Sequence, residues 1–120
     1  MLLGFGALGV LTRYELQVFV SQRWPEHAHM ATFVANVAGS FAMGAVYVLS
    51  LEKAQISDEM RLAIMVGFLG GMTTFSSYAL ESIRLLESGN VVRTFLYVAL
   101  SPALSIAFCF LGLVTARKFG

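Results

Sequence analysis

Apolar residues fill four long stretches of the chain, and short polar segments separate them. The stretches cover residues 2–20, 30–51, 60–86 and 92–114. Each is close to the roughly 20 apolar residues that a helix needs to cross a membrane. Pro25 interrupts the first connection, Ser57 is placed to cap the third helix, and residues 88–90 are typical of a turn. The pattern predicts an all-α membrane protein with four transmembrane helices in a single domain, residues 1–120.

Composition supports a lipid environment. Of the residues, 58% are hydrophobic and 12% are charged, whereas a soluble domain carries about 25% charged residues. The net charge is +1, and no basic cluster is longer than Arg117-Lys118, which argues against a nucleic-acid partner. The single cysteine, Cys109, cannot form an intrachain disulfide, and zinc needs several ligands. We therefore interpret Cys109 as a packing residue.

The third stretch has a defect in its middle. Residues 67–71 read Gly-Phe-Leu-Gly-Gly, and residues 73–77 read Thr-Thr-Phe-Ser-Ser. Adjacent glycines and hydroxyl side chains make a poor helix interior, so we expect the third helix to be broken near the middle of the membrane. Such a break frees carbonyl oxygens for a cation and points helix ends at charge. Gly67 and Gly71 also fit a close helix-packing face, and the two interpretations are compatible.

Lysine and arginine are nearly balanced between the two sides of the predicted bundle. One side carries Lys53, Arg61, Arg117 and Lys118, and the other carries Arg23, Arg84 and Arg93. Because the difference in these residues orients a membrane protein, the balance predicts a chain that can insert in either direction. Two such chains can pair antiparallel around a twofold axis. Four helices enclose little space, so we expect any pathway to lie at a subunit interface.

Polar residues within the apolar stretches are the first candidate functional residues. They are spaced by four residues in the second and fourth stretches, as Thr32, Asn36 and Ser40, and as Tyr97, Ser101 and Ser105. This spacing places each set on one helix face. Uncharged donors on a face can replace the water around a small anion, but serine and threonine also bond back to their own helix. Each face is therefore either an ion track or a packing face, and Asn36 is the stronger candidate because an amide cannot satisfy itself.

Two ionisable and two aromatic residues complete the candidates. Arg13 lies inside the first stretch, where it either snorkels toward the membrane surface or faces a polar vestibule or a partner helix. Glu81, in the second half of the third stretch, lies either in the membrane or near its surface. Phe75 and Tyr78 follow the break. The positive edge of an aromatic ring can face an anion without holding it too tightly, although packing in a core is the alternative.

Three segments resemble the CrcB/Fluc fluoride-channel family. Residues 6–14 (GALGVLTRY) resemble its glycine-rich first-helix motif, residues 32–41 (TFVANVAGSF) its asparagine-centred second-helix motif, and residues 67–78 (GFLGGMTTFSSY) its third-helix break. The resemblance implies a passive, fluoride-selective channel of the prokaryotic plasma (inner) membrane, which exports fluoride and so lowers its toxicity in the cytoplasm. It also implies an antiparallel, dual-topology homodimer in the lipid bilayer, with two pores at the interface.

The same resemblance implies roles for individual residues. The backbone carbonyls of Gly70 and Thr73 from both subunits are expected to hold a structural sodium ion. Arg13 is expected beside the vestibule, and Glu81 matches the acidic residue that follows the break. Tyr78 stands where the family has a second phenylalanine, and its added hydroxyl leaves its place in the pathway open. The implied fluoride pathway consists of aromatic, amide and hydroxyl side chains: Phe75, Tyr78, Asn36, Thr32, Tyr97, Ser101 and Ser105.

Two other classes of function remain open. A small proton-coupled multidrug exporter is also a four-span, dual-topology dimer of about this size, and it relies on a glutamate in its first helix, for which Glu15 is the candidate. The glycine-threonine break has no purpose in an exporter of that kind. The other class is an accessory subunit that packs against a larger membrane complex.

Overall fold

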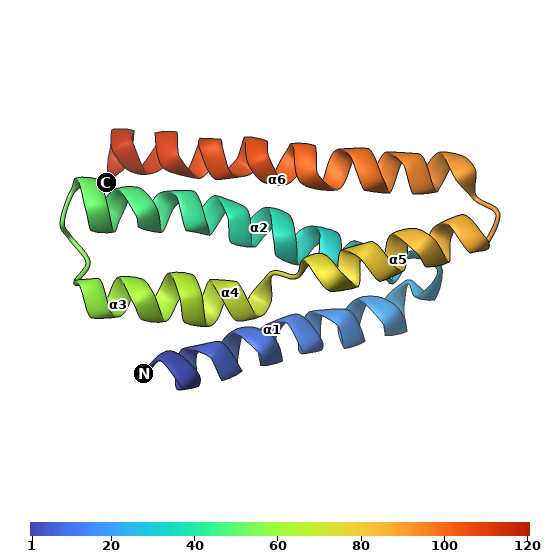
Figure 1. Ribbon diagram of the computed structural model, residues 1–120, viewed down its shortest axis with the longest axis horizontal. Coiled ribbons are helices and arrows are strands. Elements are labelled where there is room, and N and C mark those ends of the chain that lie inside the picture. Colours follow the sequence, from blue (N-terminus) through green and yellow to red (C-terminus); the bar gives the residue numbers. More distant parts are fainter.

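The chain is entirely helical apart from short connections. The computed structural model describes residues 1–120, and Figure 1 shows the helices side by side. The first half comprises α1 (Leu2–Arg23), the short η1 (Pro25–His27), α2 (Met30–Tyr47) and its wider π-helical continuation η2 (Val48–Glu52). The third helix comprises α3 (Asp58–Leu62), the π-helical η3 (Ala63–Leu69), α4 (Gly70–Met72) and, after a break, α5 (Phe75–Glu87). The last helix is α6 (Val91–Phe119).

Local sequence explains where the helices begin and end. The side chain of Ser57 accepts a hydrogen bond from the backbone N–H of Met60, which confirms its predicted role as the cap of α3. Asn90 caps α6 in the same way, through the N–H of Arg93. Gly89 has a φ of +88°, the left-handed conformation that reverses the chain after α5. The predicted turn at residues 88–90 is therefore confirmed.

Three helices are long and apolar enough to cross a membrane. They cover Met30–Glu52, Asp58–Glu87 and Val91–Phe119. The first helix, α1, has 22 residues, but Arg13, Glu15 and several glycines dilute its apolar character. The chain is thus a multi-pass membrane protein, and a fourth span remains a prediction. Both termini lie at the same end of the bundle in Figure 1, as an even number of crossings requires.

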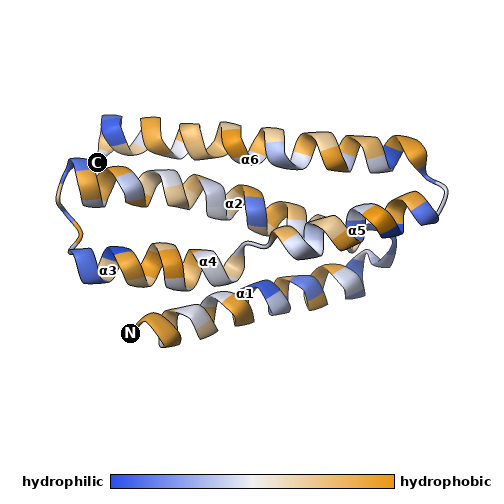
Figure 2. Cartoon of the chain, viewed as in Figure 1, coloured by the Kyte–Doolittle hydropathy of each residue, from blue (hydrophilic) through white to orange (hydrophobic).

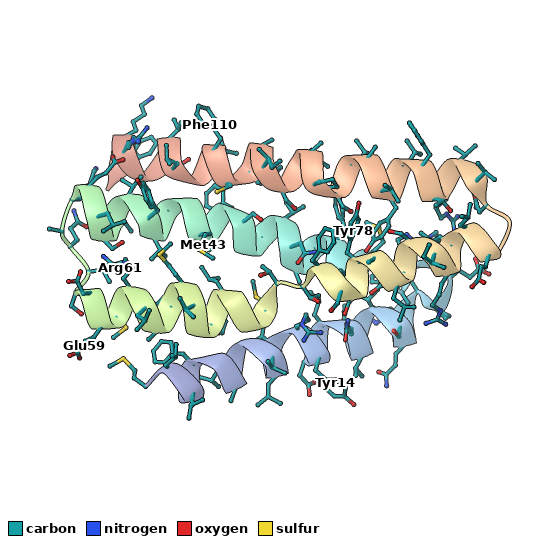
Figure 3. The ribbon with its side chains drawn as sticks, viewed as in Figure 1. Tyr14, Met43, Glu59, Arg61, Tyr78 and Phe110 are labelled. Carbon is teal, nitrogen blue, oxygen red and sulfur yellow. The ribbon has the colours of Figure 1, made fainter.

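Apolar side chains cover the outside of the bundle and also fill the contacts between its helices. Only 17 of 120 residues are buried, and Phe95, Ile106 and Phe110 are exposed on α6. Figure 2 shows hydrophobic residues along every long helix, and Figure 3 shows Phe110 pointing away from the bundle. A soluble protein of this size could not remain monomeric with such a surface. Lipid or other protein must therefore cover it.

Glycines bring the helices into backbone contact. α1 packs along η3 and α4, while α2 packs along α6. A Cβ atom at Gly9 would overlap the carbonyl oxygen of Phe68, and one at Gly112 would overlap that of Phe41. A Cβ at Gly71 would stand 2.7 Å from the carbonyl oxygen of Gly6. The glycine-rich packing face predicted for the third helix is therefore confirmed, together with its break.

Candidate functional site

The break in the third helix is made by two threonines. α4 ends at Met72, and Thr73 and Thr74 are extended, with φ, ψ angles of −86°, 152° and −154°, 130°. The hydroxyl of Thr73 donates to the carbonyl of Leu69 at 2.9 Å, which closes the first half-helix. The hydroxyl of Thr74 accepts from the N–H of Ser77 and so begins α5. The sequence placed the break in the right segment, but its glycines stay helical.

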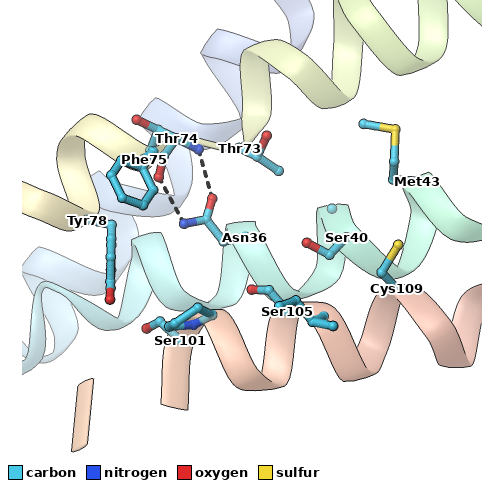
Figure 4. A pocket seen from close by; sticks show the side chains of 13 residues that line it. Asn36, Ser40, Met43, Thr73, Thr74, Phe75, Tyr78, Ser101, Ser105 and Cys109 are labelled. Atoms are coloured by element: carbon cyan, nitrogen blue, oxygen red, sulfur yellow. Dashed lines mark hydrogen bonds between the residues drawn. The ribbon is translucent and has the colours of Figure 1, made fainter. Parts of the chain in front are cut away.

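Asn36 on α2 bonds to both backbone groups of Thr74. Its amide nitrogen donates to the carbonyl of Thr74 at 3.0 Å, and its amide oxygen accepts from the N–H of Thr74 at 2.8 Å. Figure 4 shows this pair as two parallel dashed lines. Neither group makes a hydrogen bond to another backbone group. Asn36 therefore supplies the hydrogen bonds that the break removes.

The carbonyl oxygens around the end of α4 differ in whether they accept a hydrogen bond. That of Gly71 accepts from Nε of Arg13 at 3.4 Å, so the arginine of α1 turns toward the break. Those of Gly70 and Thr73 accept no hydrogen bond from backbone or side chain. Arg13 is half-buried rather than fully exposed. Its positive charge stands at the negative end of a half-helix, where it is electrostatically favoured.

A groove of about 410 Å³ lies beside the break, between α2, α5 and α6. Figure 4 shows side chains from all three helices facing it. It brings together Asn36, Thr73, Phe75, Tyr78, Ser101 and Ser105 from the predicted set. No charged residue lines the groove. Uncharged polar groups, aromatic rings and apolar side chains are therefore the groups that it offers to a solute.

Several lining residues were not predicted as functional, although their spacing was visible. Met43 extends the face of Asn36 and Ser40 by one more turn, and Cys109 follows Ser105 by four residues. Cys109 thus faces the groove as well as packing between helices. Pro102 and Ile106 line the groove from α6. The spacing of three and four residues could have identified them once the two polar faces were known to meet.

Thr32, Glu81 and Tyr97 lie outside the groove, in a polar cluster of their own. The hydroxyl of Thr32 donates to Oε1 of Glu81 at 2.6 Å. The second carboxylate oxygen of Glu81 and the hydroxyl of Tyr97 are buried without a hydrogen-bond partner. The hydroxyl of Ser101, on the groove, is buried and unpartnered too. A buried polar group without a hydrogen-bond partner destabilises the fold unless water or another polar species binds to it.

A row of aromatic rings joins the groove to this cluster. The ring centroids of Phe75 and Tyr78 are 5.4 Å apart, and those of Tyr78 and Tyr97 are 5.3 Å apart. His29 follows, with its ring 4.9 Å from that of Tyr97 and nearly perpendicular to it. Phe75 is 78% exposed and stands on the open side of the groove. The hydroxyl of Tyr78 donates to the carbonyl of Val98 on α6 at 2.6 Å, so it is engaged by protein backbone.

A second, more polar cavity of about 610 Å³ lies at the end of the row. Its lining includes His29, Glu81, Arg84 and Arg93. Burial lowers the pKa of His29 below 6.5, and the charges of Arg93 and His27 lower it further. His29 is therefore favoured in its neutral form. Glu81 lines this cavity and accepts a hydrogen bond from Thr32, so it belongs to both the cavity and the polar cluster.

Comparison with known proteins gives a consistent result over nearly the whole chain. A family described as "CrcB-like protein, Camphor Resistance (CrcB)" matches residues 1–113. A protein of Stutzerimonas stutzeri (strain A1501) named "Fluoride-specific ion channel FluC" is 41% identical over 93% of this chain and 90% of its own. A protein of Roseiflexus sp. (strain RS-1) with the same name is 44% identical over 92% of this chain and 90% of its own. The region that the family matches, residues 1–113, contains every candidate residue described above.

Proposed function

This chain belongs to the CrcB-like family, and from that premise we propose that it is a fluoride-selective ion channel. It lets fluoride leave the cell passively across the plasma (inner) membrane of a prokaryote and so lowers its toxicity in the cytoplasm. The observation that carries the proposal is the near full-length similarity to proteins named as fluoride-specific ion channels. These relatives are channels, so no enzymatic activity is proposed.

The chemistry of the groove suits a small, strongly hydrated anion. An anion that leaves water needs donors close by, and Ser101 and Ser105 supply hydroxyl groups to the groove. Tyr97 supplies a further hydroxyl on α6, one turn beyond Ser101. A lysine or arginine side chain in direct contact with the anion would hold it too tightly for rapid conduction, and no charged side chain lines the groove. The ring edges of Phe75 and Tyr78 offer weaker attraction. On this proposal, Thr32 and Glu81 form the polar end of the pathway. This end adjoins the second cavity, which Arg84 lines.

The open side of the groove supports assembly as an antiparallel homodimer with two pores. Phe75 and much of α6 are exposed in a single chain, although they border the groove. A second copy would supply the missing wall. The near balance of cations at the two ends of the bundle fits insertion in both directions. Cross-linking between exposed α6 positions of oppositely oriented copies tests this arrangement, and a monomer that conducts fluoride would exclude it.

A structural sodium ion fits the free carbonyls at the break. Gly70 and Thr73 present carbonyl oxygens without a hydrogen-bond donor, and oxygen atoms are the ligands that hard cations prefer. We propose that these groups from both subunits hold the ion. The bound charge would lower the electrostatic cost of an anion in the membrane. Replacing all sodium by a large organic cation during reconstitution should therefore reduce fluoride flux or unfold the dimer.

Ion release from liposomes that contain only the purified protein tests the proposed function. We expect fluoride, followed with a fluoride-selective electrode, to leave rapidly while chloride stays inside. Folded protein that releases no fluoride would refute the proposal and reopen the exporter and the accessory subunit. Proton-coupled drug transport that is lost in Glu15→Gln would then favour the exporter. Glu15 is exposed on α1 and makes no hydrogen bond or ion pair.

A further inference from the structure

Pro102 lies inside α6, where it removes one backbone donor. In a helix each N–H donates to the carbonyl four residues earlier, and the carbonyl four residues before Pro102 is that of Val98. Proline has no N–H, so this carbonyl loses its usual partner. Within a membrane an unpaired backbone carbonyl is expensive, and proline is tolerated where a neighbouring helix supplies a replacement donor.

The replacement donor comes from α5. The hydroxyl of Tyr78 donates to the carbonyl of Val98 at 2.6 Å, a short and strong hydrogen bond. The one other hydrogen bond from α5 to a neighbouring helix joins Glu81 to Thr32 of α2, and none of the residues of α5 is buried. Figure 3 shows Tyr78 on the inner side of α5. One hydrogen bond therefore links the side chain after the break to the helix that carries the hydroxyl groups of the groove.

We propose that Tyr78 is a positioning residue, whose hydroxyl takes the place of the N–H missing at Pro102 and thereby fixes the Tyr78 ring at the wall of the groove. The ring lies between those of Phe75 and Tyr97, at 5.4 and 5.3 Å. Fixing it therefore orients the middle ring of the aromatic row. A phenylalanine at this position could not make the bond, so Tyr78 and Pro102 act as a pair. The functional part of this inference rests on the proposed fluoride pathway.

The pair predicts non-additive effects of Tyr78→Phe and Pro102→Ala. With Pro102 present, Tyr78→Phe leaves the Val98 carbonyl unpaired and releases the ring. Since one hydrogen bond is worth about 1 kcal/mol, we expect fluoride flux to fall about fivefold. In the Pro102→Ala background, the N–H that the substitution restores already satisfies the Val98 carbonyl, and Tyr78→Phe should change flux less than about twofold. An equal effect of Tyr78→Phe in both backgrounds would overturn the proposal. Tyr14→Phe is the matched control, because Tyr14 is exposed on α1 and makes no hydrogen bond.

A direct signal from the Val98 carbonyl keeps the test independent of transport. The chain has three Val-Ala pairs, at residues 34–35, 37–38 and 98–99. Labelling valine carbonyl carbon with ¹³C and alanine nitrogen with ¹⁵N therefore gives three NMR correlations, two of them internal references. We expect Tyr78→Phe to shift the Val98 signal alone, and to shift it only when residue 102 is proline.

A Val98 signal that does not move in Tyr78→Phe would show that the hydrogen bond is absent and would overturn the proposal. Wild-type protein that releases no fluoride would instead refute the proposed function, whatever the Val98 signal does. A shifted signal together with unchanged fluoride flux would also overturn the positioning role. The two readouts thus separate failure of the hydrogen bond from failure of the pathway.

Discussion

Replacing Asn36 should destabilise the helix break more than any other single polar substitution in the groove. Asn36→Ala removes both hydrogen bonds to Thr74, at 3.0 and 2.8 Å. Each bond contributes about 1 kcal/mol net, and each backbone group left unpaired costs about 1–3 kcal/mol. Allowing for partial rescue by water, we expect the free energy of unfolding to fall by about 2–4 kcal/mol.

Asn36→Asp separates the hydrogen bonds from the charge. Its carboxylate keeps an acceptor for the N–H of Thr74 but loses the donor to the Thr74 carbonyl, which it now repels. It also places a negative charge on the wall of an otherwise uncharged groove. We expect this variant to block fluoride flux even where the protein remains folded, because like charges repel strongly in a low dielectric.

Asn90→Ala provides the matched control. The Asn90 side chain caps α6 at an exposed site, with its Oδ1 3.0 Å from the N–H of Arg93. Losing such a cap costs about 1 kcal/mol and should leave flux unchanged. Unfolding in mixed detergent micelles and fluoride release from liposomes measure the two effects. The reasoning is refuted if Asn36→Ala costs no more than Asn90→Ala, or if Asn36→Asp conducts fluoride like the wild type.

Three further substitutions or conditions test other parts of the account. Phe75→Ile should cut fluoride flux severely in a folded dimer, because it removes the exposed ring at the groove, and full flux would show that Phe75 only packs. Gly9→Ala should lower the free energy of unfolding by about 1–3 kcal/mol through overlap with backbone, whereas Gly4→Ala, which meets open space, should not. The lowered pKa of His29 means that the unfolded chain binds its proton more readily than the folded one. Stability should therefore fall as the pH drops from about 7 through 6.5 toward 5, and an NMR titration giving His29 a pKa above 6.5 would contradict this.

The sequence predicted the break because composition alone disfavours a continuous helix there. It could not identify which residues leave the helix. Glycines and hydroxyl residues were both expected weak points, yet Gly70 and Gly71 remain helical. The backbone of α1 packs closely against Gly71, whereas Gly70 is exposed. Thr73 and Thr74 leave it instead, since their hydroxyl groups and Asn36 supply replacement partners. Those partners come from another helix, which no local pattern reveals.

The candidate site was predictable to the extent that polar spacing marks a helix face. Asn36, Ser101 and Ser105 do face one groove, as two donor-bearing faces suggested. Thr32 belongs to the same face as Asn36 in sequence, yet one turn away it meets Glu81 instead. The sequence does not predict what the hydroxyl of Tyr78 bonds to, because its partner depends on the distance between α5 and α6. Tertiary packing decides such pairings, and sequence spacing does not.

The potential across a bilayer that contains the purified protein tests the central claim most directly. With a tenfold fluoride gradient and equal chloride on both sides, a fluoride-selective channel should give a reversal potential of about 59 mV, with the sign set by fluoride. Reversing the gradient should reverse the sign without changing the magnitude. A reversal potential near zero, or one that follows a chloride or proton gradient instead, would contradict the assignment as a fluoride-selective channel.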